Sequence, residues 1–185
     1  MEQIVYTLNT SEEPLYAAFK IRVGVVYIDV LILAPLTFGL LQYNLIYIKS
    51  FMLSVVLSFV PVIYKCWMEK EYGATFGKKI MKISVVSEKL QRLSYQEVCI
   101  RNYYYFIGLI TAITANYFLY ALPDFQAANT FNEVWELKDM QFPHKIIRYA
   151  LTLLMVIDGL LMFKSSRNQT LHDRLGKTVV IKKQL

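Results

Sequence analysis

Four long apolar stretches are the feature that most constrains how this chain can fold. A helix needs about 20 predominantly apolar residues to cross the hydrocarbon core of a bilayer. The stretches are Val23–Leu41, Phe51–Met68, Tyr103–Leu122 and Ile146–Phe163. Each is close to that length, so the sequence predicts an all-α membrane protein in which four transmembrane helices form a bundle.

The composition indicates that lipid surrounds these stretches. Hydrophobic residues make up 56% of the chain and charged residues 18%, whereas about 25% of residues are charged in soluble domains. Tyrosines and phenylalanines gather at both ends of the third stretch, as in the aromatic belts of membrane interfaces. The N-terminal segment shows no cleavable signal peptide. We therefore expect a single membrane domain over residues 1–185.

The basic residues predict how the helices are oriented. Lys49, Lys138, Lys145 and Arg148 are the only four of the 20 Lys and Arg residues that fall on one side of the predicted helices. The other basic residues fall on the opposite side, together with both termini. Cytosolic segments carry the excess of Lys and Arg, so both ends of the chain are expected in the cytosol. The net charge of +6 is thereby explained by orientation, and no nucleic-acid partner is expected.

Three segments outside the apolar stretches have patterns of their own. The alternating residues Ile80–Ser87 favour a strand within a cytosolic hairpin at about 78–95, which an amphipathic helix follows. Thr178–Lys183, in the cytosolic tail 164–185, is also typical of a strand. Because these segments share one side of the membrane, we expect them to pair in a small sheet. A further helix, at the membrane interface, is expected around Thr130–Met140.

Three motifs together resemble the RDD family of small prokaryotic membrane proteins. The first is IRVGVVYIDVLI, which contains Arg22 and Asp29. The second is GATFGK followed by MKISVV, and the third is TLHDRLGKTVV in the tail. The motif residues of the second and third segments are Gly73, Thr75, Gly77, Lys78, Leu171, His172, Asp173 and Arg174. The order and spacing of the motifs agree with the family over nearly the whole chain.

This resemblance carries expectations about fold, location and function. It implies three or four transmembrane helices in a prokaryotic cell (inner) membrane. It also implies that the arginine and two aspartates of the family name correspond to Arg22, Asp29 and Asp173. Function in the family is mostly unassigned, and transport of unidentified ligands, including cation–proton exchange, has been proposed for it.

Asp29 and Asp158 are the candidates for an ion or proton site. An ionisable side chain inside a membrane helix costs several kcal/mol unless it has a partner or faces a cavity. Both acids lie about five or six residues from the cytosolic ends of their helices, roughly 8–9 Å deep, where they could share a proton or a cation. The alternatives are that Asp29 only locks helix packing, or that Lys65 neutralises one of the acids.

Arg22 and Asp173 are the candidates for an ion pair on the cytosolic side. Arg22 lies about 10 Å along the helix from Asp29, which is too far for direct pairing, but it is placed to reach an acid in the tail. Such a pair would join the first helix to the tail as a structural clasp. The functional alternative is a gate that opens and closes with this ion pair.

Other kinds of site are not indicated by the sequence. GATFGK has three residues between its glycines where a phosphate-binding loop has four. We interpret its glycines as turn residues, with Lys78 and Lys79 near anionic lipid heads. No nucleophile has a visible base, and His144 and His172 are expected on opposite sides. We therefore expect no enzyme, cofactor or metal site.

Two classes of function follow. The first is a small transporter or cation/proton exchanger for a small cation or other ligand, with Asp29 as its site. The second is a non-catalytic membrane scaffold or interaction protein. Four helices are few for a secondary transporter, so a transporter is expected to be a homo-oligomer with Asp29 facing a wet cavity. A monomer whose Asp29 is fully paired would favour the scaffold.

Overall fold

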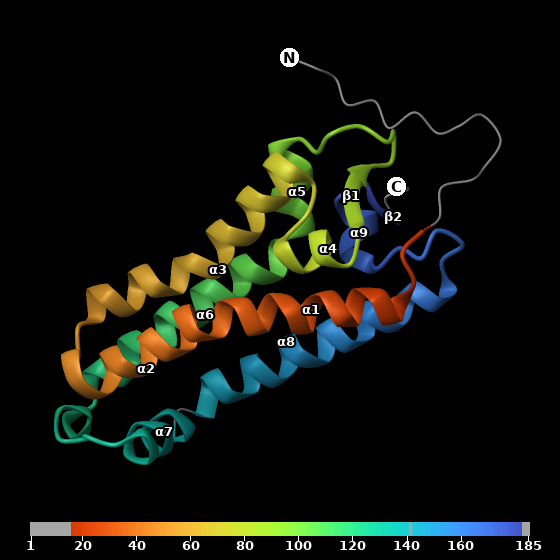
Figure 1. Cartoon of the computed structure of the whole chain (residues 1–185). Coiled ribbons are helices and arrows are strands. Elements are labelled where there is room, and N and C mark those ends of the chain that lie inside the picture. Colours follow the sequence, from red (N-terminus) through yellow and green to blue (C-terminus); the bar gives the residue numbers. More distant parts are fainter. Residues whose placement is uncertain (1–15, 141, 183–185) are drawn as a thin grey trace. The chain divides into compact units, whose positions relative to one another are not determined.

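The computed structural model describes residues 16–140 and 142–182 and confirms the four long apolar helices (Figure 1). The long helices are α1 (Phe19–Ala34), α3 (Phe51–Tyr72), α6 (Tyr103–Ala121) and α8 (Phe142–Leu161). By length and composition, four segments are able to cross a membrane: Phe19–Ile48, Phe51–Tyr72, Tyr103–Ala121 and Lys145–Lys164. The predicted all-α membrane class therefore holds, with a two-stranded sheet added to it.

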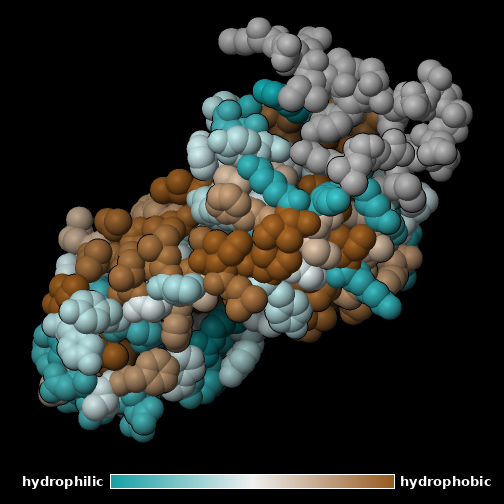
Figure 2. All heavy atoms as spheres, viewed as in Figure 1, coloured by the Kyte–Doolittle hydropathy of each residue, from teal (hydrophilic) through white to brown (hydrophobic). Residues whose placement is uncertain are grey.

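The side chains on these helices are those of a protein solvated by lipid. Figure 2 shows hydrophobic side chains over much of the helical surface. Leu31, Met52 and Ile110 are exposed by 73%, 70% and 64% of their areas. Apolar patches this large are not tolerated on a monomer in water, whereas they match the hydrocarbon of a bilayer.

The first spanning segment changes its winding at Pro35. A π-helical turn, η1 (Pro35–Gly39), begins there and is followed by α2 (Leu40–Tyr43) and a second π turn, η2 (Asn44–Ile48). Proline has no N–H for the helical ladder, so a wider turn at this point has a local cause. The helical segment ends at Lys49, whose φ of 53° is left-handed.

The chain forms two compact units by its internal contacts. Among the described residues, unit 1 comprises 16–30, 64–103 and 155–182, and unit 2 comprises 31–63, 104–140 and 142–154. Unit 1 holds the short elements α4 (Phe76–Ile80), β1 (Ile83–Ser87), α5 (Tyr95–Arg101), η4 (Met162–Lys164), α9 (Leu171–Leu175) and β2 (Thr178–Lys182). Unit 2 holds η3 (Pro123–Gln126) and α7 (Phe131–Asp139).

The sheet of unit 1 joins segments nearly 100 positions apart in the sequence. β1 pairs antiparallel with β2, and Val85 lies opposite Val180. Both valines are buried in the core of this unit with Ala17, Val25 and Val98. The predicted pairing of the two strand segments is therefore confirmed.

The local hairpin predicted at about 78–95 differs from the structure. The sole partner of β1 among the described residues is β2, and the chain turns after Ser87 and enters α5. The Ser94 side chain accepts a hydrogen bond from the Glu97 backbone, and the Glu97 carboxylate accepts one from the Ser94 backbone. This capping box begins a helix, so the residues before it do not return along β1 as a strand.

Unit 2 is built on a turn, a buried ring and a short helix. Asn44 is fully buried and donates to the Ser50 carbonyl (2.9 Å) and to Ser54 Oγ (2.8 Å), which fixes the turn between α1 and α3. Phe125 is the largest buried side chain of this unit's core. Helix α7 lies where a helix over Thr130–Met140 was predicted, and Thr130 caps it.

Candidate functional site

Asp29 is held by three donors from its own unit. On helix α1, its carboxylate accepts hydrogen bonds from Thr75 Oγ1 (2.6 Å), the Gly77 backbone N–H (2.8 Å) and Tyr64 Oη (3.1 Å). Hydrogen bonds to a charged acceptor are the strong ones in proteins. Three of them leave this carboxylate well satisfied by the chain itself.

The GATFGK motif supplies the seat for this carboxylate. Thr75 also caps helix α4, because its side chain accepts from the Lys78 backbone. A Cβ at Gly77 would lie only 2.6 Å from the Val25 carbonyl oxygen and 2.9 Å from Asp29 Oδ1. Gly73 has a φ of +63°, which glycine adopts without strain. The motif thus allows α4 to approach α1 closely. Asp29 can then accept hydrogen bonds both from Thr75, which caps α4, and from the backbone of Gly77 within α4.

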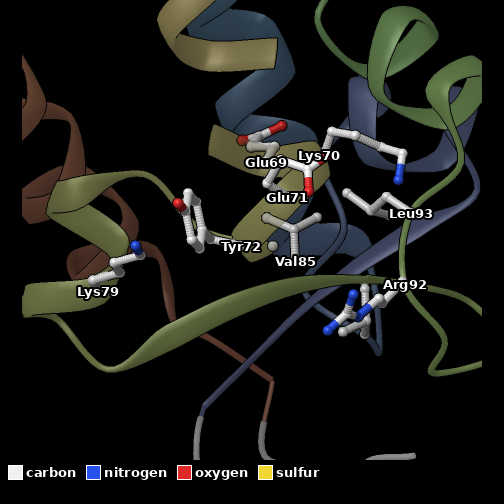
Figure 3. A pocket seen from close by; sticks show the side chains of 10 residues that line it. Glu69, Lys70, Glu71, Tyr72, Lys79, Val85, Arg92 and Leu93 are labelled. Carbon is white, nitrogen blue, oxygen red and sulfur yellow. The ribbon is translucent and has the colours of Figure 1, made fainter. Parts of the chain in front are cut away.

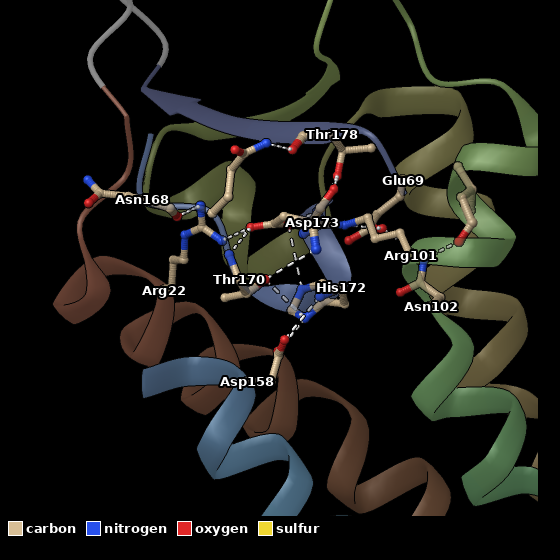
Figure 4. Close-up of polar contacts among 12 residues, drawn as sticks. Arg22, Glu69, Arg101, Asn102, Asp158, Asn168, Thr170, His172, Asp173 and Thr178 are labelled. Carbon is tan, nitrogen blue, oxygen red and sulfur yellow. Dashed lines mark hydrogen bonds and ion pairs between the residues drawn. The ribbon is translucent and has the colours of Figure 1, made fainter. Parts of the chain in front are cut away.

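The structure brings Arg22 and Asp173 together, as the sequence predicted (Figure 4). Arg22 Nη1 donates to Asp173 Oδ2 at 2.5 Å, and Nη2 donates to the Asn168 carbonyl at 2.7 Å. Asp173 also accepts from the backbone of Thr170, which caps helix α9. The first helix and the tail are therefore joined through a side chain that shapes the tail's own helix.

Arg101 is the centre of a larger group of charges. Its Nη1 binds Asp173 Oδ1 and donates to Thr178 Oγ1 (2.8 Å), while its Nε lies 3.3 Å from Glu69 Oε2. Arg101 thus bridges the tail acid to Glu69 on helix α3. Gly176 makes room for it, because a Cβ there would lie 2.9 Å from Arg101 Cβ.

Glu69 gathers the remaining charges. It binds Lys78 Nζ, lies 3.3 Å from Lys65 Nζ and accepts from Asn102 Nδ2 at 2.9 Å. We call the connected side chains the ionic network. Its members are Arg22, Lys65, Glu69, Lys78, Arg101, Asn102 and Asp173.

The ionic network is buried, and burial sets its protonation. Glu69 and Asp173 are 0% exposed, and Arg101 is 4% exposed. Burial alone would raise the pKa of Asp173, but the Arg101 and Arg22 guanidiniums hold that pKa well below its usual range. Burial lowers the pKa of Lys78 to about 7. The charge of Glu69 opposes this shift, and the nearby positive charges of Lys65 and Arg101 add to it.

Asp158 has a partner of its own. Its Oδ2 lies 2.5 Å from His172 Nδ1, and its Oδ1 accepts from the His172 backbone at 3.0 Å. His172 Nε2 lies 3.6 Å from Asp173 Oδ1, so this pair adjoins the ionic network. Asp29 and Asp158 are bound by different side chains, and among the residues that the structure describes no contact joins the two acids.

The sequence did not predict a role in the site for Glu69 or Arg101, the two central residues of the network. Glu69 lies four residues after Lys65, a spacing that pairs charges on one helix face, and that was its only local signal. Lys65 was considered as a partner for an intramembrane aspartate, but it pairs with Glu69. Lys78 was placed near lipid heads, but it is 5% exposed and also binds Glu69. Leu171 and Arg174 lie exposed on α9.

Chemically, this site is an array of paired charges. In the ranges 16–140 and 142–182, no three His, Cys, Asp or Glu side chains gather in a way that could hold a metal ion. What the network does is fasten α1, α3, α4, α5 and α9 to one another inside unit 1. Buried charges persist only when they are paired in this way.

Comparison with known proteins gives one family match. The sequence profile of the RDD family matches residues 16–177. That range includes Arg22, Asp29, the GATFGK motif and Asp173. No curated protein and no solved structure gives a significant match. Because the profile covers most of the chain, this membrane protein belongs to the RDD family.

Proposed function

We propose that this protein is a non-catalytic membrane scaffold of a prokaryotic cell membrane, whose unit 1 faces the cytosol. The observation that carries the proposal is the complete pairing of Asp29 by Thr75, Gly77 and Tyr64. An exchange site must release its bound proton or cation to water, whereas this carboxylate is bound by groups that belong to the fold.

The ionic network supports the same reading. A buried ion pair is often no more stabilising than apolar residues of the same size, and one use of such pairs is to fix a single conformation. Here the pairs connect helices from widely separated parts of the sequence. A unit braced in this way offers a fixed surface to other membrane proteins.

Ion-driven proton movement in proteoliposomes tests this proposal first. The native protein is reconstituted with a pH-sensitive dye inside, and a Na⁺ or K⁺ gradient is applied. A scaffold gives the same dye signal as empty liposomes. Gradient-dependent proton movement that Asp29→Asn abolishes, and that a folded Tyr64→Phe variant retains, would contradict the proposal.

A scaffold must also have a partner. We expect the protein to migrate in mild detergent as a stable assembly with another membrane protein at a fixed ratio. Arg22→Gln should release the partner, because it removes an ion pair of the ionic network. Arg167→Gln, at an exposed position before α9, should not release it. A chain that is always alone or only self-associated in native mass spectrometry would contradict the scaffold.

A proton-coupled transporter is the second candidate, and the Asp158–His172 pair favours it. The imidazole bridges two carboxylates, at 2.5 Å from Asp158 and 3.6 Å from Asp173, and its side chain is 24% exposed. Histidine is the side chain best suited to accept and release protons near neutral pH. If the liposomes do move protons, His172→Gln should abolish the movement, and the active species should be a homo-oligomer.

A further inference from the structure

Unit 1 contains a pocket beside the ionic network, and Glu69 is the one lining residue that belongs to that network. It has a volume of about 240 Å³ and is lined by the end of α3, by α4, by the middle of β1 and by the segment before α5. Figure 3 shows that Lys70, Lys79 and Arg92 come from three different segments around the pocket, namely the end of α3, α4 and the loop before α5. Val85 and Leu93 give it an apolar floor.

The charges that line this pocket are mostly positive. Lys79 and Arg92 are exposed and Lys70 is half-buried. Glu71 is the opposing carboxylate exposed in the lining. Glu69 also borders the pocket, but its side chain is 0% exposed and already binds three cations. The free charge in the pocket is therefore that of a binding site for an anion.

Two of these cations are held in place by aromatic rings. Lys79 Nζ lies 3.7 Å from the centre of the Tyr72 ring, and Lys70 Nζ lies 4.8 Å from that of Tyr95. A ring face attracts a cation without neutralising its charge. The two ammonium groups are thus positioned in advance while they keep their charge for a ligand.

The location selects the kind of anion. Lys70 and Tyr72 are in the last turn of the candidate spanning segment Phe51–Tyr72. The ring of Trp67 packs edge-on against Tyr72 with the ring centres 5.6 Å apart, and both residues are about half exposed. Exposed Trp and Tyr at the end of a spanning helix lie at the level of lipid headgroups. Basic pockets at that level bind anionic lipid phosphates.

We propose that the pocket formed by Lys70, Lys79 and Arg92 binds the phosphate of an anionic phospholipid headgroup. The volume suits a headgroup rather than a larger ligand, and the apolar floor accommodates its glycerol carbons. The lipid-binding proposal does not depend on the scaffold proposal. Its test gives the same answer whether or not the protein moves ions.

Trp67 provides the reporter for the test. Trp135 is the only other tryptophan and lies on α7 in unit 2, so Trp135→Phe leaves Trp67 as the sole tryptophan beside the pocket. The full chain with this change is titrated with phosphatidylglycerol in dodecylmaltoside micelles. Phosphatidylcholine and inorganic phosphate serve as separate titrations. We expect a saturable change in Trp67 emission with phosphatidylglycerol only.

Charge variants decide whether the pocket is the site. Lys79→Gln and Arg92→Gln should each raise the half-saturating lipid concentration about fivefold. Lys89→Gln removes the same charge at an exposed position outside the pocket and should change nothing. Glu71→Gln should lower the half-saturating concentration about twofold or more, because it removes the opposing carboxylate.

The outcomes separate the possible sources of phosphate. Saturation by inorganic phosphate without a response to phosphatidylglycerol would keep an anion site but overturn the lipid as its ligand. A phosphatidylglycerol response that is the same in the Trp135→Phe protein and in its Lys79→Gln, Arg92→Gln and Glu71→Gln variants would overturn the pocket itself. Because Glu71→Gln is expected to strengthen binding, loss of folding cannot imitate its result.

Discussion

At the scale of single residues, Arg101 is expected to have a large effect on stability. It is 4% exposed and contacts both Asp173 and Glu69. Removing one partner of a buried ion pair costs about 3–5 kcal/mol, because the charge left behind is uncompensated. We expect Arg101→Met to lower the free energy of unfolding by about that amount. Unfolding of the purified protein by a denaturing detergent measures it.

The control is Arg174→Met, which removes an exposed arginine from α9. Surface substitutions of this kind usually change stability by less than about 0.5 kcal/mol. If Arg101→Met and Arg174→Met were to destabilise the protein equally, the ionic network would not be the brace that its geometry indicates.

Lys78 gives the network a dependence on pH. Its pKa is about 7 in the folded protein, where burial disfavours the charged form, whereas an unfolded chain restores an ordinary lysine pKa of about 10.4. Between these values the unfolded state binds more protons than the folded state, so stability rises with pH. We expect the midpoint of thermal unfolding to rise from pH 7 to pH 9.5 in native protein. In Lys78→Met the rise should be smaller, and an unchanged rise would contradict the assignment.

Asp173 should determine how stability depends on pH in the acidic range. Its pKa lies well below its ordinary value because of Arg101 and Arg22, although burial opposes them. A carboxylate whose pKa is lowered by folding contributes stability above its unfolded pKa of about 3.9, and the contribution is lost as pH falls toward the folded value. Unfolding midpoints measured from pH 6 down to pH 3 should therefore fall more in native protein than in Asp173→Asn. Parallel curves would argue against this ion pair.

The residues of the site were predictable only in part. Arg22 and Asp173 could be paired from the sequence because a charge at the start of a membrane helix must find a partner, and a tail acid was available. The roles of Glu69 and Arg101 depend on the packing of α5 against α9, and no local pattern encodes that contact. Asp29 and Asp158 could be singled out by their cost in a membrane, but their donors come from distant segments.

At the scale of elements, the approach of α4 to α1 depends on Gly77. A Cβ at this position would lie 2.6 Å from a backbone oxygen of α1, and neither backbone can move aside without breaking the hydrogen bonds to Asp29. We expect Gly77→Ala to lower stability by about 1–3 kcal/mol, as overpacking of a filled site usually does. Detergent-induced unfolding measures the loss.

Gly108 in helix α6 is the comparison. A Cβ there would meet no atom within 4 Å, and alanine favours a helix over glycine by about 1 kcal/mol. Gly108→Ala should therefore be neutral or stabilising in the same assay. A loss of stability as large as that of Gly77→Ala would show that a general sensitivity to glycine replacement, rather than the α1–α4 contact, is being measured.

The elements themselves followed from local patterns wherever one pattern was strong. Apolar length predicted the four long helices, and β-branched alternation predicted β1 and β2. The prediction of a second hairpin strand after β1 was wrong. The capping box of Ser94 and Glu97 starts helix α5 there instead. The π turn at Pro35 could be anticipated as an irregularity, but its form depends on how the later residues pack.

At the scale of the whole molecule, the distribution of Lys and Arg predicts which ends of the helices face the cytosol. The argument is independent of the fold, because it counts only charges near the ends of the spanning segments. It places the turn after β1 inside the cell and helix α7 outside. Chemical labelling of single cysteines in intact cells tests this placement.

Two positions are suited to the probes. Lys89 and Asn132 are exposed, and neither takes part in a cap that starts a helix. In a background where Cys66 and Cys99, the only cysteines, are replaced by serine, a membrane-impermeant maleimide should label Asn132→Cys in intact cells. It should label Lys89→Cys only after the cells are opened. The reverse pattern would invert the topology, and with it the cytosolic placement of the ionic network on which the scaffold proposal depends.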